Sequence, residues 1–430
     1  MTAIRHIILG NGERLSLLMN ENGTPDFWLT LFIIERVRPT QTQSSINNVI
    51  NHLKHLRLWE TINDRDLSEE FSIGQLLTVV DVHSIRDHCR LDVKSLKHHI
   101  KKSSSNVVTF VTASTYSVHP LKTVTANHAA NRMRYVTEYL DFLARTVLKK
   151  RLIEANISEA VKDMNTLLIK NKPKSSSGTS LGGDPNVKSA PPEAFVKIMS
   201  IIQEESPENP YKYSDVKMRN SLMFEVLNAT GIRSGELLSL QVNDIDFFEG
   251  RLSVVRRHDA KEDPRILQPT VKTRARTVPI DIGLAQRIRK YVMEVRSVIP
   301  QARKHPYIFV THKKGEFYGQ PVSNSTFVNR IVNPAIGVCP EILSEISRHG
   351  FRHYFNYRLS KLIDERNEAA KTNPSIKSIN EKQELQIRKE LNGWASDSTA
   401  ETYNLRHIRE EANHLMLEDI KYWTKFIKEE

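Results

Sequence analysis

Six side chains scattered through this sequence have the chemistry needed to break a phosphodiester bond with a protein hydroxyl group. Two are arginines, whose paired N–H donors match the oxygens of a phosphate. A lysine, a histidine and an indole can hold that phosphate or deliver a proton to the leaving oxygen. A tyrosine can supply the attacking hydroxyl. In chain order these residues are Arg233, Lys272, His349, Arg352, Trp394 and Tyr403.

The first arginine lies in the phrase TGIRSGEL, which predicts a corner between two helices. We expect one helix to end at Thr230-Gly231, because glycine favours the position after a helix C-terminus. We expect the next to begin after Ser234, a residue type typical of an N-cap. Arg233 would then project from the corner, with Glu236 close enough to support it. The phrase is also compatible with an ordinary corner that exposes an arginine.

The lysine lies in the phrase QPTVKTRARTVPI, which predicts a β-hairpin with one strand before Lys272 and another after Arg276. A lysine at the tip of a hairpin is usually solvated. Its ammonium group can also reach into a DNA groove and protonate a leaving oxygen. Lys261 is the second choice for that role.

The phrase RHGFRHYF places His349, Arg352 and His353 at positions i, i+3 and i+4, so one face of a helix presents all three. Arg352 can bind phosphate oxygens, and His349 can bind the same phosphate or carry a proton. Two histidines four residues apart also match a zinc spacing. An arginine between them disfavours a cation, so we expect no metal. A purely structural role for the histidines stays open.

The tyrosine lies in the phrase LNGWASDSTAETYNL near the C-terminus. Asn392-Gly393 predicts the end of one helix, which would present Trp394. Ser398 and Glu401 form a capping-box pattern, so the next helix would carry Tyr403 in its first turns. A tyrosine on a helix usually packs in the core or is exposed to solvent. We consider this one as a nucleophile only because two arginines that can bind phosphate precede it in the sequence.

Elements that can position these residues are predicted by periodicity. Apolar residues at helical spacing predict helices over TQSSINNVINHLKHLRLW and TANHAANRMRYVTEYLDFLARTVL, and shorter helices over residues 192–203 and 214–229. Runs typical of extended structure begin at Arg251, Ile266 and Arg276, and a short apolar run begins at Tyr307. We therefore expect a mainly α fold with a small antiparallel sheet, an α+β catalytic domain preceded by a helical domain.

Domain boundaries follow from a change in composition. Residues 171–192 are rich in Ser, Gly and Pro, which predicts a flexible linker. We divide the chain into an N-terminal arm (1–24), a helical DNA-binding domain (25–170), that linker (171–192) and a catalytic domain (193–430). The C-terminal segment carries Leu415, Ile420, Trp423 and Ile427 near helical spacing. It can dock on a neighbouring subunit or pack on its own domain.

Positive charge gathers in one part of the chain. The protein has a formal net charge of +12, and residues 86–174 hold 17 Lys and Arg against 7 Asp and Glu, so 17 − 7 = +10. A phosphate backbone is a natural partner for such a stretch, although a solvated basic surface explains it as well. The expected DNA contacts are Arg132, Arg134, Arg145, Lys149, Lys150 and Arg276.

Composition excludes several other classes of protein. The longest apolar runs are shorter than the roughly 18 residues that suggest a membrane span, and the N-terminus does not read as a signal peptide. Two cysteines, Cys89 and Cys339, predict no disulfide framework. We therefore expect a cytoplasmic protein.

The segment from about Pro192 to Arg409 resembles the tyrosine recombinase, or phage-integrase, family. TGIRSGELLSLQVNDID is similar to the first arginine motif of that family, with Glu236 as the neighbouring acid. The family's hairpin lysine falls on Lys272, followed by an R-x-V-P phrase at Arg276, and its H-x-x-R-H motif falls on residues 349–353. The nucleophile position falls on Tyr403.

Two departures from the family pattern stand out. The usual L-G-H phrase reads Asn392-Gly393-Trp394, and some members of the family do carry tryptophan there. The stretch between His353 and Trp394 is longer than the family leads us to expect, with an apparent insertion or extra helix around residues 371–390. The N-terminal half matches only as a helical core-binding (SAM-like) domain.

The resemblance implies a site-specific DNA recombinase, an integrase or transposase of a mobile element, that works through a 3′-phosphotyrosyl intermediate. It implies two domains closing as a C-shaped clamp on double-stranded DNA, with four protomers on paired sites, in a nucleoid-associated protein of bacterial type. It implies no metal, ATP or other cofactor, and it leaves open whether a partner recombinase or accessory protein takes part. Two alternatives stay open: a type IB-like topoisomerase or telomere resolvase, and an accessory factor of the same fold that binds DNA without cutting it.

Overall fold

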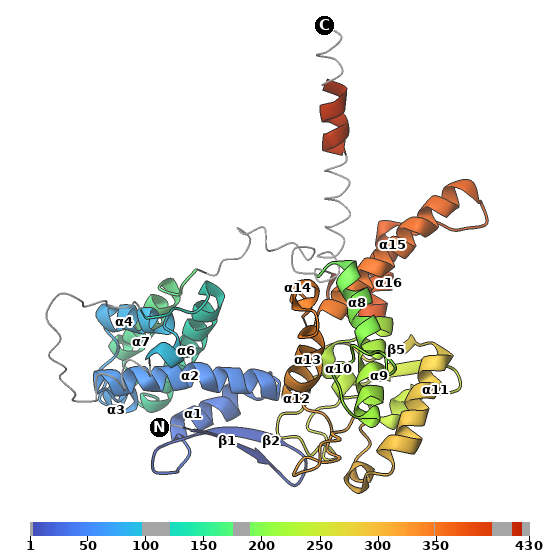
Figure 1. Cartoon of the computed structure of the whole chain (residues 1–430). Helices are drawn as coiled ribbons and strands as arrows, with labels where there is room; N and C mark the ends of the chain where they lie inside the picture. The colour runs from blue at the N-terminus through green and yellow to red at the C-terminus, as the bar shows by residue number, and fades with distance from the viewer. Residues whose placement is uncertain (1–2, 97–120, 175–189, 348, 398–414, 424–430) are drawn as a thin grey trace, which may run out of the picture. The chain divides into compact units, whose positions relative to one another are not determined.

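The computed structural model describes residues 3–96, 121–174, 190–347, 349–397 and 415–423. The chain divides into two compact units (Figure 1). The first comprises residues 1–9 and 14–180, and the second comprises residues 10–13 and 181–430. Each unit has its own hydrophobic core.

The first unit begins with an antiparallel β-hairpin. Its strands are β1 (Ala3–Ile8) and β2 (Arg14–Met19), paired so that Ala3 lies opposite Met19 and Ile8 opposite Arg14. Alternate residues of β2 are buried, and Leu18 is fully covered by the helical core. Most of the segment that the sequence sets apart as an arm therefore belongs to this unit, whereas its residues 10–13 belong to the second unit.

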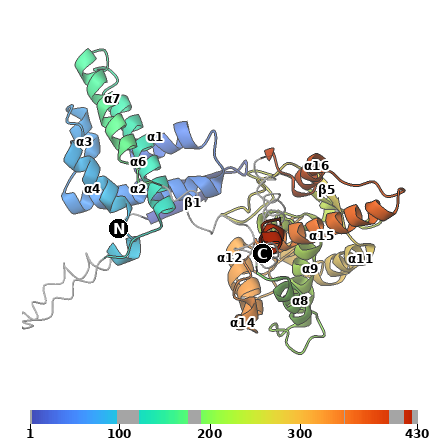
Figure 2. The ribbon, with the colours of Figure 1, turned by 90° about the horizontal axis from the view of Figure 1, so that it is seen from above.

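Helices make up the rest of the first unit. They are α1 (Phe27–Phe32), η1 (Ile33–Val37), α2 (Gln43–Asn63), α3 (Leu67–Ser72), α4 (Val79–Cys89), α6 (Ala126–Val147) and α7 (Ala155–Lys170). The predicted apolar stripes of α2 and α6 are confirmed, since residues such as Val49 and Leu140 are fully buried. Helix α6 contacts α1, α2, α3, α4 and α7, so it is the central helix of the unit (Figure 2).

A three-stranded antiparallel sheet lies in the second unit, in the order β3 (Ile245–Asp246), β4 (Arg251–Val254), β5 (Arg276–Pro279). Helices and single turns surround it: α8 (Pro192–Ile201), α9 (Ser214–Thr230), α10 (Ser234–Leu238), η3 (Val242–Asp244), α11 (Ile282–Lys290), η4 (Tyr291–Arg296), η5 (Pro300–Lys304), α12 (Asn324–Thr326), η6 (Phe327–Val332), α13 (Asn333–Ile336), α14 (Pro340–Leu343), α15 (Gly350–Thr372) and α16 (Glu381–Asn392). The expected fold class, mainly α with small antiparallel sheets, is confirmed.

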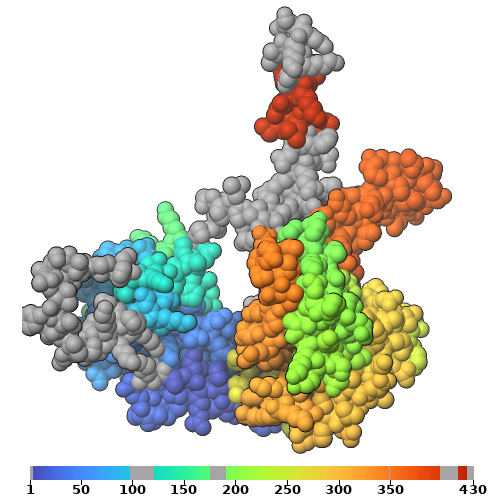
Figure 3. All heavy atoms as spheres, viewed as in Figure 1, coloured from blue at the N-terminus to red at the C-terminus, as the bar shows by residue number. Residues whose placement is uncertain are grey.

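Helices α15 and α16 form a helical hairpin that contains the insertion expected around residues 371–390. They run side by side, with Ser360 of α15 hydrogen-bonded to Arg388 of α16 (Figures 1 and 2). The tip of this hairpin stands clear of the rest of the second unit (Figure 3). Residues 371–390 thus comprise the end of α15, a connecting loop (373–380) and most of α16.

Two predictions about local structure are wrong. The run from Ile266 to Val271 is not a strand, so Lys272 lies in a loop before β5 and not at the tip of a hairpin. Its Val271 is buried in the core while Ile266 is exposed, which shows that the run packs as an irregular segment. The N-cap of α10 is Arg233, one residue before the Ser234 that we expected.

Three further findings concern the whole of the described chain. None of its helices is both long and apolar enough to cross a membrane. Cys89 is buried, Cys339 is half-buried, and both thiols are free. Residues 415–423 are helical with exposed side chains, including Leu415, Ile420 and Trp423, whereas Ile427 lies outside the described residues.

Candidate active site

The site begins at the corner between α9 and α10. Helix α9 ends at Thr230, and Gly231 follows with φ of +61°, a left-handed conformation that other residues adopt only with strain. A Cβ atom on Gly231 would lie 2.5 Å from the ring of Phe355, so the close packing of α15 also requires glycine. The corner presents Arg233, whose side chain is partly exposed.

Glu236 ties this corner to the loop before β5. Its buried carboxylate accepts a hydrogen bond from the main-chain N–H of Arg233 at 3.0 Å and one from the hydroxyl of Thr273 at 2.6 Å. It also pairs with the guanidinium of Arg276 at 2.9 Å. The role predicted for Glu236, support for Arg233, is consistent with this position, and the carboxylate lies 3.5 Å from the Arg233 guanidinium.

Electrostatics keep Glu236 charged although it is buried. Burial alone would raise the pKa of its carboxyl group. The charge of Arg276 and the hydrogen bonds from Arg276, Thr273 and the Arg233 main chain outweigh that effect, and the pKa is lowered. The corner and the loop are therefore held together by a carboxylate that stays ionised at neutral pH.

Arg352 joins the same corner to the end of α16. Its Nη1 donates to the carbonyl oxygen of Gly231 at 3.1 Å, and its Nη2 donates to that of Asn392 at 2.7 Å. Its guanidinium carbon lies 5.4 Å from the ring centroid of Trp394, within range of a cation–π contact. Arg352 and Trp394 are each 4% exposed, so both are fixed by packing before any substrate binds.

The loop that carries Lys272 is attached to the same place. The N–H of Arg274 donates to the carbonyl oxygen of Gly393 at 3.0 Å, and Arg276 donates to that of Leu391 at 2.8 Å. Lys272 itself is exposed and precedes Thr273, the partner of Glu236. A cavity of about 250 Å³ beside this loop is lined by Arg274, Ala275, Arg276, Gln386, Lys389, Glu390, Gly393 and Trp394.

The two histidines lie at the start of α15. His349 is its exposed N-cap residue, and His353 is half-buried one turn later. They lie at the same helix end as Arg352, but His349 precedes the first residue of the helix, Gly350. The nucleophile assigned to Tyr403, and the capping pattern of Ser398 and Glu401, lie outside the described residues.

Two of the predicted DNA contacts have buried side chains whose donors bind groups of the protein itself. Arg276 is 7% exposed, and its guanidinium donates hydrogen bonds to Glu236, Thr273 and the carbonyl of Leu391. Arg132 is 3% exposed, and its guanidinium donates to the carbonyl oxygens of Cys89 and Leu91. Both arginines bind groups in the interior of their own units.

The other predicted contacts of the first unit lie at its surface. Lys149 and Lys150 are exposed. Arg145 pairs with Asp141 at 2.9 Å, and Arg134 lies 3.6 Å from Glu138 and over the ring of Tyr135. These two arginines are partly neutralised by neighbours on their own helix.

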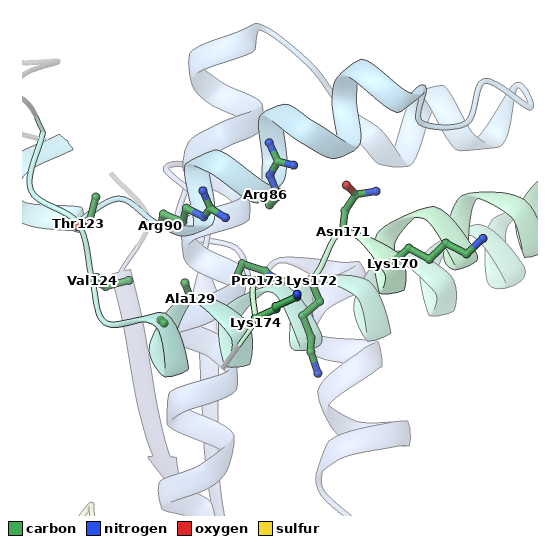
Figure 4. A pocket seen from close by; sticks show the side chains of 11 residues that line it. Arg86, Arg90, Thr123, Val124, Ala129, Lys170, Asn171, Lys172, Pro173 and Lys174 are labelled. Carbon is green, nitrogen blue, oxygen red and sulfur yellow. The ribbon is translucent and has the colours of Figure 1, made fainter. Parts of the chain in front are cut away.

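A basic cluster that sequence reasoning did not single out lies between α4 and the end of α7. It lines a cavity of about 610 Å³ (Figure 4). Its cationic side chains, which we call the α4–α7 basic cluster, are Arg86, Arg90, Lys170, Lys172 and Lys174. Asp87 pairs with Arg86 at 2.9 Å and so offsets part of the charge. The signal in the sequence was the excess of lysine and arginine over residues 86–174.

Sequence reasoning also missed several groups whose hydrogen bonds fix the site residues. They are the Thr273 hydroxyl and the main-chain carbonyls of Gly231, Leu391 and Asn392. Main-chain carbonyls are present in every residue, so the amino-acid sequence cannot reveal which of them act as acceptors. Among the described residues, no cluster of three or more His, Cys, Asp or Glu side chains could hold a metal ion.

Comparisons with known proteins found a family model and several relatives that match part of the chain. Residues 192–363 match the phage integrase family model. The chain is 26% identical over 182 residues to the tyrosine recombinase XerD of Proteus mirabilis, covering 40% of this chain and 52% of that protein. It is 24% identical over 176 residues to XerD of Halalkalibacterium halodurans, with the same two coverages. The chain thus spans about half the length of the curated relatives it matches.

Among solved structures, the chain is similar to the Tn1549 transposon integrase in complex with transposon right-end DNA, at 13% identity, 91% and 98% coverage and a TM-score of 0.45. It is also similar to a lambda integrase dimer bound to a core site, at 14% identity, 87% and 96% coverage and a TM-score of 0.42. The family match includes Arg233, Lys272, His349 and Arg352. Over residues 192–363 the chain is thus similar to the phage integrase family.

Proposed function

We propose that this protein is a site-specific DNA recombinase that cuts and rejoins strands through a 3′-phosphotyrosyl intermediate. The observation that carries the proposal is the position of Arg352, whose guanidinium is bonded both to the α9–α10 corner beside Arg233 and to the end of α16 beside Trp394. Three distant parts of the chain thus converge on one cationic group. Such a group can stabilise the charge that develops on a phosphate in the transition state.

In the proposed cleavage step, the hydroxyl of Tyr403 attacks phosphorus and forms the phosphotyrosyl bond, while the bond to the 5′ oxygen of the DNA breaks. Arg233 and Arg352 bind the non-bridging oxygens. Lys272 donates a proton to the departing 5′ oxygen, which leaves as a hydroxyl group. His349, His353 and Trp394 hold the phosphate and assist proton transfer.

Rejoining is the same step in reverse. A 5′ hydroxyl of the partner strand attacks the phosphotyrosyl phosphorus, and the tyrosine hydroxyl leaves with a proton. One phosphodiester-type bond is exchanged for another, so the chemistry requires no ATP and no metal-activated nucleophile. We propose that the enzyme works without either.

The proposed partner is double-stranded DNA that carries paired recombination sites of a mobile element. The stretch of residues 86–174, with its net charge of +10, supports a dedicated DNA-binding function for the first unit. We assign its phosphate contacts to the α4–α7 basic cluster together with Arg134, Arg145, Lys149 and Lys150. A tetramer on two sites, with or without an accessory protein, would complete exchange of both strands.

The proposal is tested with a library of nicked duplexes whose central sequence is randomised. Cleavage next to the nick releases a short strand, so the covalent protein–DNA adduct cannot be resealed and accumulates. We expect an adduct that survives denaturant, enriched in particular sequences, from the parent and none from Tyr403→Phe. An equal yield from Tyr403→Phe contradicts the assigned nucleophile.

Other results would redirect the assignment. Adducts without sequence preference, accompanied by relaxation of any supercoiled plasmid, would indicate a topoisomerase. Tight binding of the enriched duplexes with no adduct would indicate an accessory factor that only binds DNA.

A further inference from the structure

A buried polar network links α15 to α16 immediately behind Arg352. The side chains of Asn356 and Asn392 exchange two hydrogen bonds, of 3.1 and 3.0 Å. Arg388 donates to the hydroxyl of Ser360 at 2.7 Å and to the carboxylate of Glu384 at 2.6 Å. Asn356, Arg388 and Asn392 are each only 1% exposed.

This network touches Arg352 at two places. The amide of Asn356 donates to the main-chain carbonyl of Arg352 at 2.9 Å, one helical turn earlier. Asn392 accepts from the Arg352 guanidinium through its own carbonyl, while its side chain bonds Asn356. Trp394 follows two residues after Asn392. A shift of α16 along α15 would therefore move the acceptor of the Arg352 guanidinium and the indole packed against it.

Stability alone does not account for these residues. Exchanging buried polar pairs for apolar side chains of similar size is often neutral or stabilising. What a fully satisfied network adds is a single permitted register, because a slip leaves several buried donors without acceptors. Apolar contacts between two helices tolerate such slips more easily.

We propose that Asn356, Arg388 and Asn392 are positioning residues that hold the Arg352 guanidinium and the Trp394 indole in register for the scissile phosphate. This proposal rests on the proposed recombinase function. None of the three side chains needs to touch DNA. They act by fixing the end of α16 against the start of α15.

The test variant replaces both amides, Asn356→Leu with Asn392→Leu. Arg388 keeps Glu384, Ser360 and the main-chain oxygen of Asn356, to which it lies at 3.3 Å. We expect a melting temperature close to that of the parent. We expect the single-turnover rate of adduct formation at saturating DNA to fall by about 10- to 100-fold, because a displacement of about 1 Å in a catalytic group can cost that much.

The matched control is Asn220→Ala. Asn220 is also a fully buried asparagine of the second unit, on α9, and its side chain accepts hydrogen bonds from Arg219 rather than from the site. We expect this variant to lose stability while the folded protein keeps the parent rate at saturating DNA. Apparent DNA affinity should stay unchanged in both proteins, so the double-leucine variant loses rate and not binding.

A second readout does not depend on cleavage. The emission of Trp394, taken as the difference between each protein and its Trp394→Phe counterpart, should change in the double-leucine variant and not in Asn220→Ala. If the parent yields no adduct with any duplex, that result contradicts the recombinase proposal alone. The change in Trp394 emission then tests the positioning role by itself. A double-leucine variant with the parent rate of adduct formation overturns the positioning role, whatever its emission.

Discussion

The guanidinium of Arg276 and the carboxylate of Glu236 lie 2.9 Å apart, and both side chains are buried. Removing one partner of such a pair leaves an uncompensated charge, which typically costs about 3–5 kcal/mol. We therefore expect Arg276→Met to lower the free energy of unfolding by about that amount in urea titrations. Arg274→Met is the control, since Arg274 is exposed in the same loop. Equal stability of the two variants would show that the pair does not hold the site together.

We expect that a side chain at Gly393 destabilises the protein, because the surrounding atoms leave no space for a Cβ atom. Its φ is +65°, and an added Cβ would lie 2.8 Å from the Arg276 guanidinium and 3.0 Å from the carbonyl oxygen of Arg274. Gly23 has φ of +82° but open space around it. Left-handed strain alone costs about 1–2 kcal/mol. Gly23→Ala should therefore lose about that much and Gly393→Ala clearly more, as measured by thermal unfolding of each full chain.

How far the sequence predicts this site depends on the physical signal that each residue leaves. The corner at Gly231 and the end of α16 at Gly393 were predictable, because a left-handed residue after a helix calls for glycine. The burial of Arg132 was not. Its helix, α6, is covered on several sides, so an arginine outside the main apolar stripe still lies in the interior.

The other features that the sequence did not predict correctly have different causes. Val271 is buried without strand pairing, because a packed loop and a strand share the same apolar residues. The network behind Arg352 did leave a signal: Asn356 and Ser360 on one helix, and Glu384, Arg388 and Asn392 on the other, are all spaced by four residues. Polar residues on one helical face are usually solvated, so only the packing of the two helices shows that this face is internal.

Lys272 is expected to act as the acid for the leaving 5′ oxygen. An alkoxide needs a proton to depart, whereas a thiolate is a far weaker base and departs without one. Lys272→Ala should therefore cut an ordinary nicked duplex much more slowly than the parent, and a duplex with sulfur at the 5′ bridging position at nearly the parent rate. Arg274→Ala controls for the loss of one positive charge from the loop. An equal loss by Lys272→Ala on both duplexes would assign the lysine to phosphate binding.

A group of buried histidines should make the first unit sensitive to acid. The rings of His52 and His128 are 5.1 Å apart, those of His55 and His88 are 4.3 Å apart, and Arg132 lies among them. Burial, with these neighbouring charges, lowers the pKa of His52 and His88 to about 4 and that of His55 to about 2. All three therefore stay neutral in the folded protein at pH 5.

The sign of the effect follows from proton uptake. Unfolded histidines bind protons below pH 6.5 while the folded ones do not, so stability is full above that pH and is lost as the pH falls toward 4. Each such proton contributes a slope of about 1.4 kcal/mol per pH unit. His52→Phe should flatten the dependence of the urea midpoint on pH between 6.5 and 4.5, and His83→Phe, at an exposed position on α4, should not. Identical slopes in the two variants would contradict the assignment.

The α4–α7 basic cluster is expected to set the salt dependence of DNA binding. Lys172 and Lys174 are exposed at its rim and can neutralise phosphates (Figure 4). Each phosphate contact that is lost lowers the slope of log affinity against log salt by about 0.9, because fewer counterions are released on binding. Lys172→Gln with Lys174→Gln should therefore weaken binding at low salt and flatten that slope, measured by fluorescence anisotropy with duplexes from the library.

The variant Arg132→Met tests whether a buried positive charge, unlike a charge at the surface, leaves the salt dependence of DNA binding unchanged. Arg132 binds the carbonyls of Cys89 and Leu91 and cannot release a counterion from DNA. Its loss leaves buried acceptors unpaired, so the first unit should become less stable while the salt slope of the folded protein stays that of the parent. The double glutamine variant should show the reverse pattern, normal stability with a reduced slope. If Arg132→Met alone reduces the slope, DNA binding must open the first unit enough to expose this arginine.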